Sequence, residues 1–304
     1  MKVIIYYLIY MNNLHPTKII NKGSQGIVLM TDNNELVVKI YFNNNHFKMT
    51  KIIKFLKKNN IPTIYKTLFF TERKNSLQRY ISNNLPQHFS YISEDNLLQL
   101  SSKYNMKPTL FEIMKKYDIT LNDFIFKLFL NDNTLNIQII KSLFYQGILT
   151  LLWLYMKKSI IHFDINTNNF FVEKTDETHF NIVIHKQKFS IPLYGYYLII
   201  ADFGHSNSIE LFEPIESQLK TNLKSYRMHP FDDINNFIRI FRKYLIHYNI
   251  TLDDLNMNFY KTKKEYINMI KSYYEKTDFK VNIDIFKNKF FEIIHKYILN
   301  FKDF

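Results

Sequence analysis

Residues 160–172 read IIHFDINTNNFFV, and residues 198–204 read LIIADFG. In each stretch a carboxylate follows an apolar run that is typical of a buried strand, Asp164 in the first and Asp202 in the second. Asn169 adds an amide to the first stretch. Carboxylate and amide oxygens are ligands that Mg²⁺ accepts, and a carboxylate can also take the proton of a hydroxyl group. The two stretches therefore predict phosphoryl transfer from ATP-bound Mg²⁺ to a hydroxyl.

The composition is that of an ordinary folded protein. The 304 residues are 46% hydrophobic and 22% charged, which excludes an intrinsically disordered chain. A chain of this length buries a substantial core and commonly forms about two domains. Because the sequence has no cysteine, it has no disulfide framework, no thiolate metal site and no cysteine nucleophile. We therefore expect an intracellular protein.

The charge balance is strongly basic. Lys+Arg 40 against Asp+Glu 27 gives a formal net charge of +13. This favours acidic partners, such as nucleic acid, anionic lipid or an acidic protein substrate, and association with nucleic acid is an expectation that rests on net charge only. The basic residues are spread along the chain, so a solvated basic surface is favoured over a dedicated nucleic-acid site. Abundant Ile, Asn, Lys, Tyr and Phe, with Gly 5, are typical of an AT-rich genome.

No membrane-spanning segment is expected. Residues 1–10, MKVIIYYLIY, are apolar but far shorter than the roughly 20 residues that a spanning helix needs. Their β-branched and aromatic side chains favour a buried strand or an amphipathic lead-in over a signal anchor. Further along the chain we expect no segment that is long and apolar enough to cross a bilayer.

Strand patterns fill the first third of the chain, and helical patterns fill most of the remainder. Strands are expected within 18–42, 64–70 and 109–114, one main helix at 46–60, an insertion at about 74–108, and later helices at 137–157 and over most of 232–304. This order predicts an α+β protein with two lobes, residues 1–116 and 117–304.

Glycines between the first two strand patterns suit a phosphate-binding loop. Residues 22–28 read KGSQGIV, and glycine lets backbone N–H groups approach phosphate oxygens. The candidate nucleotide-binding residues of this loop are Gly23, Ser24, Gln25, Gly26 and Val28. Alone, such a loop is more often a tight turn. Lys39 follows one strand later, however, and would place an ammonium near the same phosphates, so we add it to the nucleotide-binding residues.

The polar residues of the two opening stretches have distinct expected roles. Asp164 is placed to accept the proton of a substrate hydroxyl, and Asn169 to ligate a metal from the same loop. His162 lies between apolar residues, so a packed loop histidine is favoured over a catalytic base. Asp202, at a strand end and followed by Gly204, is expected to chelate Mg²⁺, with a polar loop cap as the alternative.

As an ordered set these motifs resemble those of the protein kinase superfamily, over nearly the whole chain from about residue 19. The set comprises the glycine-rich loop, the strand lysine, HxDxxxxN at 162–169 and DFG at 202–204. The resemblance implies a two-lobed kinase-like fold, with a β-rich N-lobe that holds one main helix and a mostly helical C-lobe. It implies a serine/threonine protein kinase that binds ATP and Mg²⁺ and transfers the γ-phosphate to a protein.

Two further segments extend the resemblance. Residues 231–241, FDDINNFIRIF, resemble the kinase helix whose aspartate supports the catalytic loop. We expect this role of Asp233, with Asp232 or a plain helix cap as alternatives. Residues 180–201 resemble the extended hairpin before DFG in haspin-like kinases and in kinases of large DNA viruses. Together with the AT-rich composition, this favours a viral protein located in the host cytoplasm or the virion.

The chain departs from the kinase pattern in several places. Phe163 stands where many kinases carry an arginine that reads a phosphorylated activation loop. Asn166 replaces a lysine that contacts the γ-phosphate, and an amide hydrogen-bonds without neutralising charge. The most serious departure is that the expected helix at 46–60 has no glutamate to pair with Lys39. The substitutes that the sequence offers are Glu72 and Glu94.

Two other functions stay open. The missing helix glutamate together with Asn166 favours a pseudokinase, a scaffold that binds nucleotide or partners without turnover. HxDxxxxN and a later metal aspartate also occur in small-molecule phosphotransferases of the aminoglycoside or choline type, although Gly204 and the glycine loop favour the protein kinase branch. The sequence leaves open the identity of the substrate, the choice between serine or threonine and tyrosine, and the oligomeric state.

Overall fold

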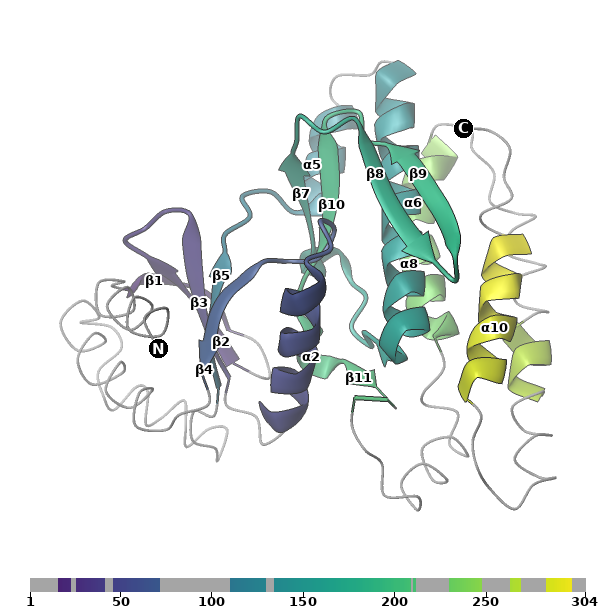
Figure 1. Cartoon of the computed structure of the whole chain (residues 1–304). Helices are drawn as coiled ribbons and strands as arrows, with labels where there is room; N and C mark the ends of the chain where they lie inside the picture. The colour runs from purple at the N-terminus through teal and green to yellow at the C-terminus, as the bar shows by residue number, and fades with distance from the viewer. Residues whose placement is uncertain are drawn as a thin grey trace. The chain divides into compact units, whose positions relative to one another are not determined.

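The structure is a computed structural model that combines helices with small antiparallel sheets (Figure 1). This confirms a protein of mixed α and β structure. The chain forms two compact units, Met1–Asp118 and Ile119–Phe304. The described residues are 16–22, 26–41, 46–71, 110–129, 134–208, 210–211, 230–247, 263–268 and 283–296. The expectations for residues 1–10 and for the insertion at 74–108 lie outside them.

The first unit is built on a five-stranded antiparallel sheet in the order β1-β2-β3-β5-β4. Its strands are β1 (Pro16–Lys22), β2 (Gly26–Thr31), β3 (Leu36–Tyr41), β4 (Thr67–Thr71) and β5 (Leu110–Lys115). The strands expected at 18–42 and 109–114 are confirmed, whereas the pattern at 64–70 forms a strand only from Thr67, because residues 61–66 form a turn and a loop. All six residues of β3 are buried, so this strand lies in the core of the unit.

The helix expected at 46–60 is confirmed as α2 (His46–Asn59). It ends where Asn60 adopts a left-handed φ of 45° and Asn59 Nδ2 donates to the Phe55 carbonyl at 2.7 Å. Its buried side chains are Met49, Thr50, Ile52, Ile53 and Leu56. None of these buried side chains is charged, and the sequence of α2, HFKMTKIIKFLKKN, contains no acidic residue.

The second unit is organised around the long helix α6 (Thr134–Lys158), which contacts α8 and several strands. This confirms the helix expected at 137–157. The other long helices among the described residues are α5 (Leu121–Phe129), α8 (Phe231–His247) and α10 (Ile283–Ile294). Buried aromatic rings link them, since Phe144 of α6 lies 5.6 Å from the ring of Phe241 in α8.

Helix α6 corrects one expectation about membranes. By length and composition its segment Asn136–Lys158 is apolar enough to cross a bilayer, so the expectation that no segment meets this test was wrong. However, 78% of the apolar window is buried inside the unit. A helix that is apolar on nearly all sides is also what the centre of a folded unit requires. The position of α6 in the core accounts for the apolar composition of this helix.

Short strands in antiparallel pairs occupy residues 160–208, which agrees with the strand-like runs expected beside Asp164 and Asp202. They are β6 (Ile160–Ile161), β7 (Phe170–Lys174), β8 (His179–Ile184), β9 (Gln187–Pro192), β10 (Tyr196–Ile200) and β11 (Asn207–Ser208), and the pairs are β6 with β11, β7 with β10 and β8 with β9. The extended hairpin expected at 180–201 is confirmed in β8 and β9. Its connecting residues, His185 and Lys186, have φ values of 48° and 68°, which suit a tight hairpin turn.

Gly147 allows α6 and α8 to pack closely. A Cβ built at this glycine would lie 2.0 Å from Cζ of Phe237, a fully buried ring. We expect Gly147→Ala to lower the free energy of unfolding by about 1–3 kcal/mol, as overpacking of cores does. Urea denaturation of the two proteins measures the loss. In a Phe237→Leu background the same substitution should cost little, and an undiminished cost there would contradict this packing argument.

Candidate functional site

The two motif stretches meet through the antiparallel pairing of β7 with β10. Phe170 lies opposite Ile200 at the end of the pair, and the N–H of Ala201 donates to the carbonyl of Asn169 at 2.9 Å. In an antiparallel pair, the residue before one strand and the residues after the other lie at the same end. The two predicted metal ligands, Asn169 and Asp202, are thereby brought to one end of this pair.

Two amides hold the carboxylate of Asp164. Asn166 Nδ2 donates to Oδ1 at 2.9 Å, and Asn169 Nδ2 donates to Oδ2 at 2.9 Å. Asn166 is fixed in turn as the N-cap of the short helix η1 (Thr167–Asn169), because its Oδ1 accepts from the N–H of Asn168 at 3.0 Å. Each carboxylate oxygen keeps a further lone pair. The carboxylate is thus oriented by the loop and still able to accept a proton.

Asp202 lies at the start of the short helix η2 (Phe203–His205). With φ 58° and ψ 66° it is in the left-handed region, and its Oδ1 accepts from the N–H of Gly204 at 3.3 Å. A non-glycine residue in this region costs of order 1 kcal/mol, and such strain clusters at functional sites. The left-handed conformation of Asp202 changes the direction of the chain between β10 and η2.

His162 is a packed part of the loop. Its ring is fully buried and lies 4.8 Å from the ring of Phe203. Nε2 donates to the Ala201 carbonyl at 2.9 Å and Nδ1 accepts from the N–H of Asp164 at 3.3 Å, which requires the neutral ring with its hydrogen on Nε2. Burial lowers the pKa of His162, although the Ala201 carbonyl and the charge of Asp202 act in the opposite direction. The ring supports the loop and is not placed as a base.

Asp233, in the first turn of α8, holds the same loop from a distant part of the sequence. Its Oδ2 accepts from the N–H of His162 at 2.5 Å and its Oδ1 from the N–H of Phe163 at 2.9 Å. Burial raises the pKa of Asp233 to about 7, against the effect of the two N–H donors. Asp232, the alternative, instead pairs with Lys263 at 2.7 Å. The contact to the loop is therefore made by Asp233.

The oxygen donors at the end of β7 and β10 suit a hard divalent cation. Asn169 directs Nδ2 toward Asp164, so its Oδ1 faces elsewhere, and within the described residues no hydrogen bond reaches that oxygen. With the carboxylate of Asp202 it provides the ligand type that Mg²⁺ accepts. No group of three or more His, Cys, Asp or Glu suited to a metal occurs in the described part of the chain. Water and phosphate oxygens would therefore complete the coordination, as is usual for Mg²⁺.

The first unit places Lys39 in the interior of its sheet. Lys39 lies opposite Val28 of β2 on one side and opposite Glu112 of β5 on the other, and it is only 7% exposed. Its ammonium lies 4.7 Å from the centre of the Tyr41 ring. The Tyr41 hydroxyl donates to Glu112 Oε2 at 2.9 Å, and the Thr67 hydroxyl donates to Oε1 at 2.5 Å.

The expected phosphate-binding loop is described only in part. Outside the described residues lie Gly23, Ser24 and Gln25, together with Glu72 and Glu94. Gly26 begins β2 opposite Tyr41, and a Cβ there would lie 2.1 Å from the carbonyl oxygen of Ile40. The close approach of β2 to β3 thus gives Gly26 a packing reason of its own, independent of any phosphate.

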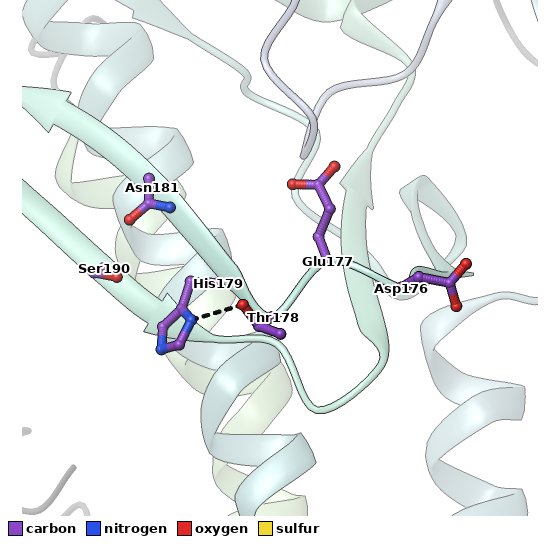
Figure 2. A pocket seen from close by; sticks show the side chains of 6 residues that line it. All are labelled: Asp176, Glu177, Thr178, His179, Asn181 and Ser190. Atoms are coloured by element: carbon purple, nitrogen blue, oxygen red, sulfur yellow. Dashed lines mark hydrogen bonds between the residues drawn. The ribbon is translucent and has the colours of Figure 1, made fainter.

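A pocket in the second unit lies apart in sequence from these motifs. It is lined by Asp176, Glu177, Thr178, His179, Asn181 and Ser190 (Figure 2). His179 Nδ1 lies 3.0 Å from Thr178 Oγ1, and Glu177 accepts from the Tyr197 hydroxyl at 2.7 Å. Figure 2 shows Asp176 and Glu177 directed away from His179. The polar groups therefore do not converge on one point, and no predicted site residue lines the pocket.

Comparison with known proteins shows a likeness to a viral protein. A curated protein of Invertebrate iridescent virus 6, described as uncharacterized protein 098R, is 29% identical over 154 residues, which are 49% of this chain and 24% of the viral protein. The chain thus matches about a quarter of that protein's length. No protein-family model matches the sequence. The viral relative is compatible with the viral origin expected from the hairpin resemblance and the AT-rich composition.

Sequence reasoning missed two buried polar residues that organise these regions. Glu112 was overlooked because it lies within the apolar strand pattern at 109–114, although a carboxylate there is itself a signal. Gln146, fully buried on α6, accepts from the N–H of Leu198 at 2.8 Å and donates to the Tyr196 carbonyl at 3.1 Å. It holds β10, and with it the strand that leads to Asp202, against α6.

Proposed function

We propose that the protein is an ATP- and Mg²⁺-dependent protein kinase that transfers the γ-phosphate to serine or threonine hydroxyls. The observation that carries this proposal is the gathering of an oriented carboxylate, Asp164, with Asn169 and Asp202. Phosphoryl transfer requires little covalent chemistry from a protein and depends mainly on positioning and on stabilising charge. These residues are of the types that supply both.

Each residue has a role in the proposal. Asp164 accepts the proton of the acceptor hydroxyl, and the amide of Asn166 keeps its carboxylate oriented. Asn169 and Asp202 hold Mg²⁺, which when bound neutralises charge on the phosphate oxygens. Lys39, from the first unit, contacts the phosphates as a point charge.

The wider proposal concerns fold, source and partners. We assign residues 1–116 to the N-lobe and residues 117–304 to the C-lobe of a kinase-like fold. The relative from an iridescent virus supports a viral origin, and for a viral protein we propose the host cytoplasm or the virion as the location. The net charge of +13 supports an acidic protein substrate.

The test is transfer of labelled γ-phosphate from Mg·ATP to casein, to histone and to the protein itself. We expect transfer that stops when Mg²⁺ is chelated and that falls by about 100-fold or more in Asp202→Asn, since a metal contributes several kcal/mol to such a step. Phosphoamino acid analysis of the product identifies the acceptor. Nucleotide binding without transfer to any of the three would favour the pseudokinase. Faster transfer to aminoglycosides or choline would favour the small-molecule phosphotransferase.

A further inference from the structure

The lysine of the proposed phosphate site has a carboxylate facing it from within its own sheet. β3 pairs with β5 in antiparallel register, and this register places Lys39 directly opposite Glu112. Residues opposite each other in such a pair lie on the same face, with Cβ atoms about 4.5–5.5 Å apart. Helix α2 carries no acidic residue in its sequence HFKMTKIIKFLKKN. A negative charge opposite Lys39 therefore comes from Glu112 of the sheet and not from α2.

The carboxylate of Glu112 is held in place by its surroundings. Glu112 is fully buried, and the hydroxyls of Tyr41 and Thr67 donate one hydrogen bond to each of its oxygens. Tyr41 also links the two charges, because the ammonium of Lys39 lies 4.7 Å from the centre of its ring. Three adjacent strands, β3, β5 and β4, contribute to this arrangement.

Among the described residues, Lys39 and Lys57 interact with the charge of Glu112. Burial raises the pKa of Glu112, while hydrogen bonds from Thr67, Tyr41 and Tyr65 and the attraction of Lys39 act in the opposite direction. Burial lowers the pKa of Lys57 in α2, and the charge of Glu112 acts in the opposite direction. Burying a carboxylate so completely costs free energy that stability alone does not require.

We propose that Glu112 is the positioning residue for Lys39, and that it orients the ammonium toward phosphate from β5 in place of a helix glutamate. The proposal rests on the proposed function, in which Lys39 contacts the phosphates. In the kinase family the corresponding carboxylate is carried by a helix. Here the pair lies within one sheet, so the placement of Lys39 does not depend on the position of α2.

The first test is Glu112→Gln, which keeps the size of the side chain and removes its charge. One of the two hydroxyls, of Tyr41 or Thr67, can still donate to the remaining oxygen, and the other can rotate to accept from the new NH2 group, so we expect the fold to be retained. We expect kcat/KM for Mg·ATP to fall by up to about 100-fold, as loss of positioning can do. We expect the melting temperature at pH 8 to fall as well, because the variant removes the negative charge opposite the nearly buried ammonium of Lys39. A structural role alone would lower the melting temperature and leave kcat/KM of the folded protein unchanged.

The second test asks whether Glu112 acts through Lys39. Lys39→Met alone should lower kcat/KM by about 10²–10³-fold, as loss of one charge-stabilising donor does. In that background Glu112→Gln should change kcat/KM within about twofold, since its target is gone. Full additivity of the two losses would overturn the proposal. Tyr41→Phe is the matched control, because it removes one hydrogen bond to Glu112 and keeps both charges and the ring.

A nucleotide-binding measurement separates this proposal from the proposed function. The affinity for a fluorescent ATP analogue is measured in the same four proteins, wild type, the two single variants and the double variant. Non-additive losses of affinity support the pairing of Glu112 with Lys39 even if wild type transfers no phosphate, in which case the kinase function alone is overturned. Additive losses in a wild type that does transfer phosphate overturn the role of Glu112 alone.

Discussion

Asp164→Asn is expected to lower the rate of phosphate transfer by about 10²–10⁴-fold, the range that a positioned general base contributes. Both oxygens of Asp164 accept from amide groups, of Asn166 and of Asn169, at 2.9 Å. An asparagine in its place would turn its own NH2 group toward the NH2 group of Asn166 or of Asn169, so one of these hydrogen bonds would be lost. It also could not take the proton of the acceptor hydroxyl. The affinity for Mg·ATP should change little, because the metal-binding roles belong to Asn169 and Asp202.

The measurement is kcat for phosphate transfer together with the affinity for a fluorescent ATP analogue. The matched control is Asp176→Asn, which makes the same chemical change at an exposed position outside the loop and should leave kcat unaltered. Equal transfer by wild type and Asp164→Asn would remove Asp164 as the base and would return the pseudokinase to consideration. A fall in nucleotide affinity as large as the fall in kcat would show that Asp164 acts in binding instead.

The elements best predicted from the sequence are those with a regular hydrophobic period. Helix α2 and the central part of α6 followed from helical periodicity, and β5 followed from a short apolar run between polar segments. Within residues 160–208 the runs beside Asp164 and Asp202 and the hairpin at 180–201 were predicted as strands, but β11 was not, because two residues are too few to show a period. Tertiary pairing, as of β6 with β11, defines such short strands.

In the candidate site, contacts within one loop could be predicted from the sequence, and contacts between distant strands could not. Asp164, Asn166 and Asn169 lie within one short loop, so their proximity is local and could be predicted from the motif. The register that sets Glu112 opposite Lys39 joins strands that lie far apart in the sequence. No local pattern contains that information, which is why the partner of Lys39 was sought in other glutamates.

Asp233→Ala is expected to destabilise the second unit more than any other substitution considered for it. Asp233 accepts from the backbone N–H groups of His162 and Phe163, and both lie in a loop that α8 supports. Each buried N–H left without an acceptor costs about 1–3 kcal/mol, so the free energy of unfolding should fall by about 2–6 kcal/mol. The loop that orients Asp164 would loosen as well, so phosphate transfer should fall by up to about 100-fold even where the variant is folded.

Urea denaturation measures this loss of free energy. Asp232→Ala is the matched control, because the carboxylate of Asp232 is half exposed and pairs with Lys263. That control should cost no more than about 1 kcal/mol.

The free energy of unfolding that is lost in Asp233→Ala should also depend on pH. Burial raises the pKa of Asp233 from 3.8 to about 7, so its stabilising contribution is complete below its unfolded pKa and declines as pH rises through 7. The difference between wild type and Asp233→Ala should therefore narrow from pH 5 to pH 8, and His162, present in both proteins, should cancel in that difference. A gap that widens with pH would mean that Asp233 stabilises the loop as an ionised carboxylate.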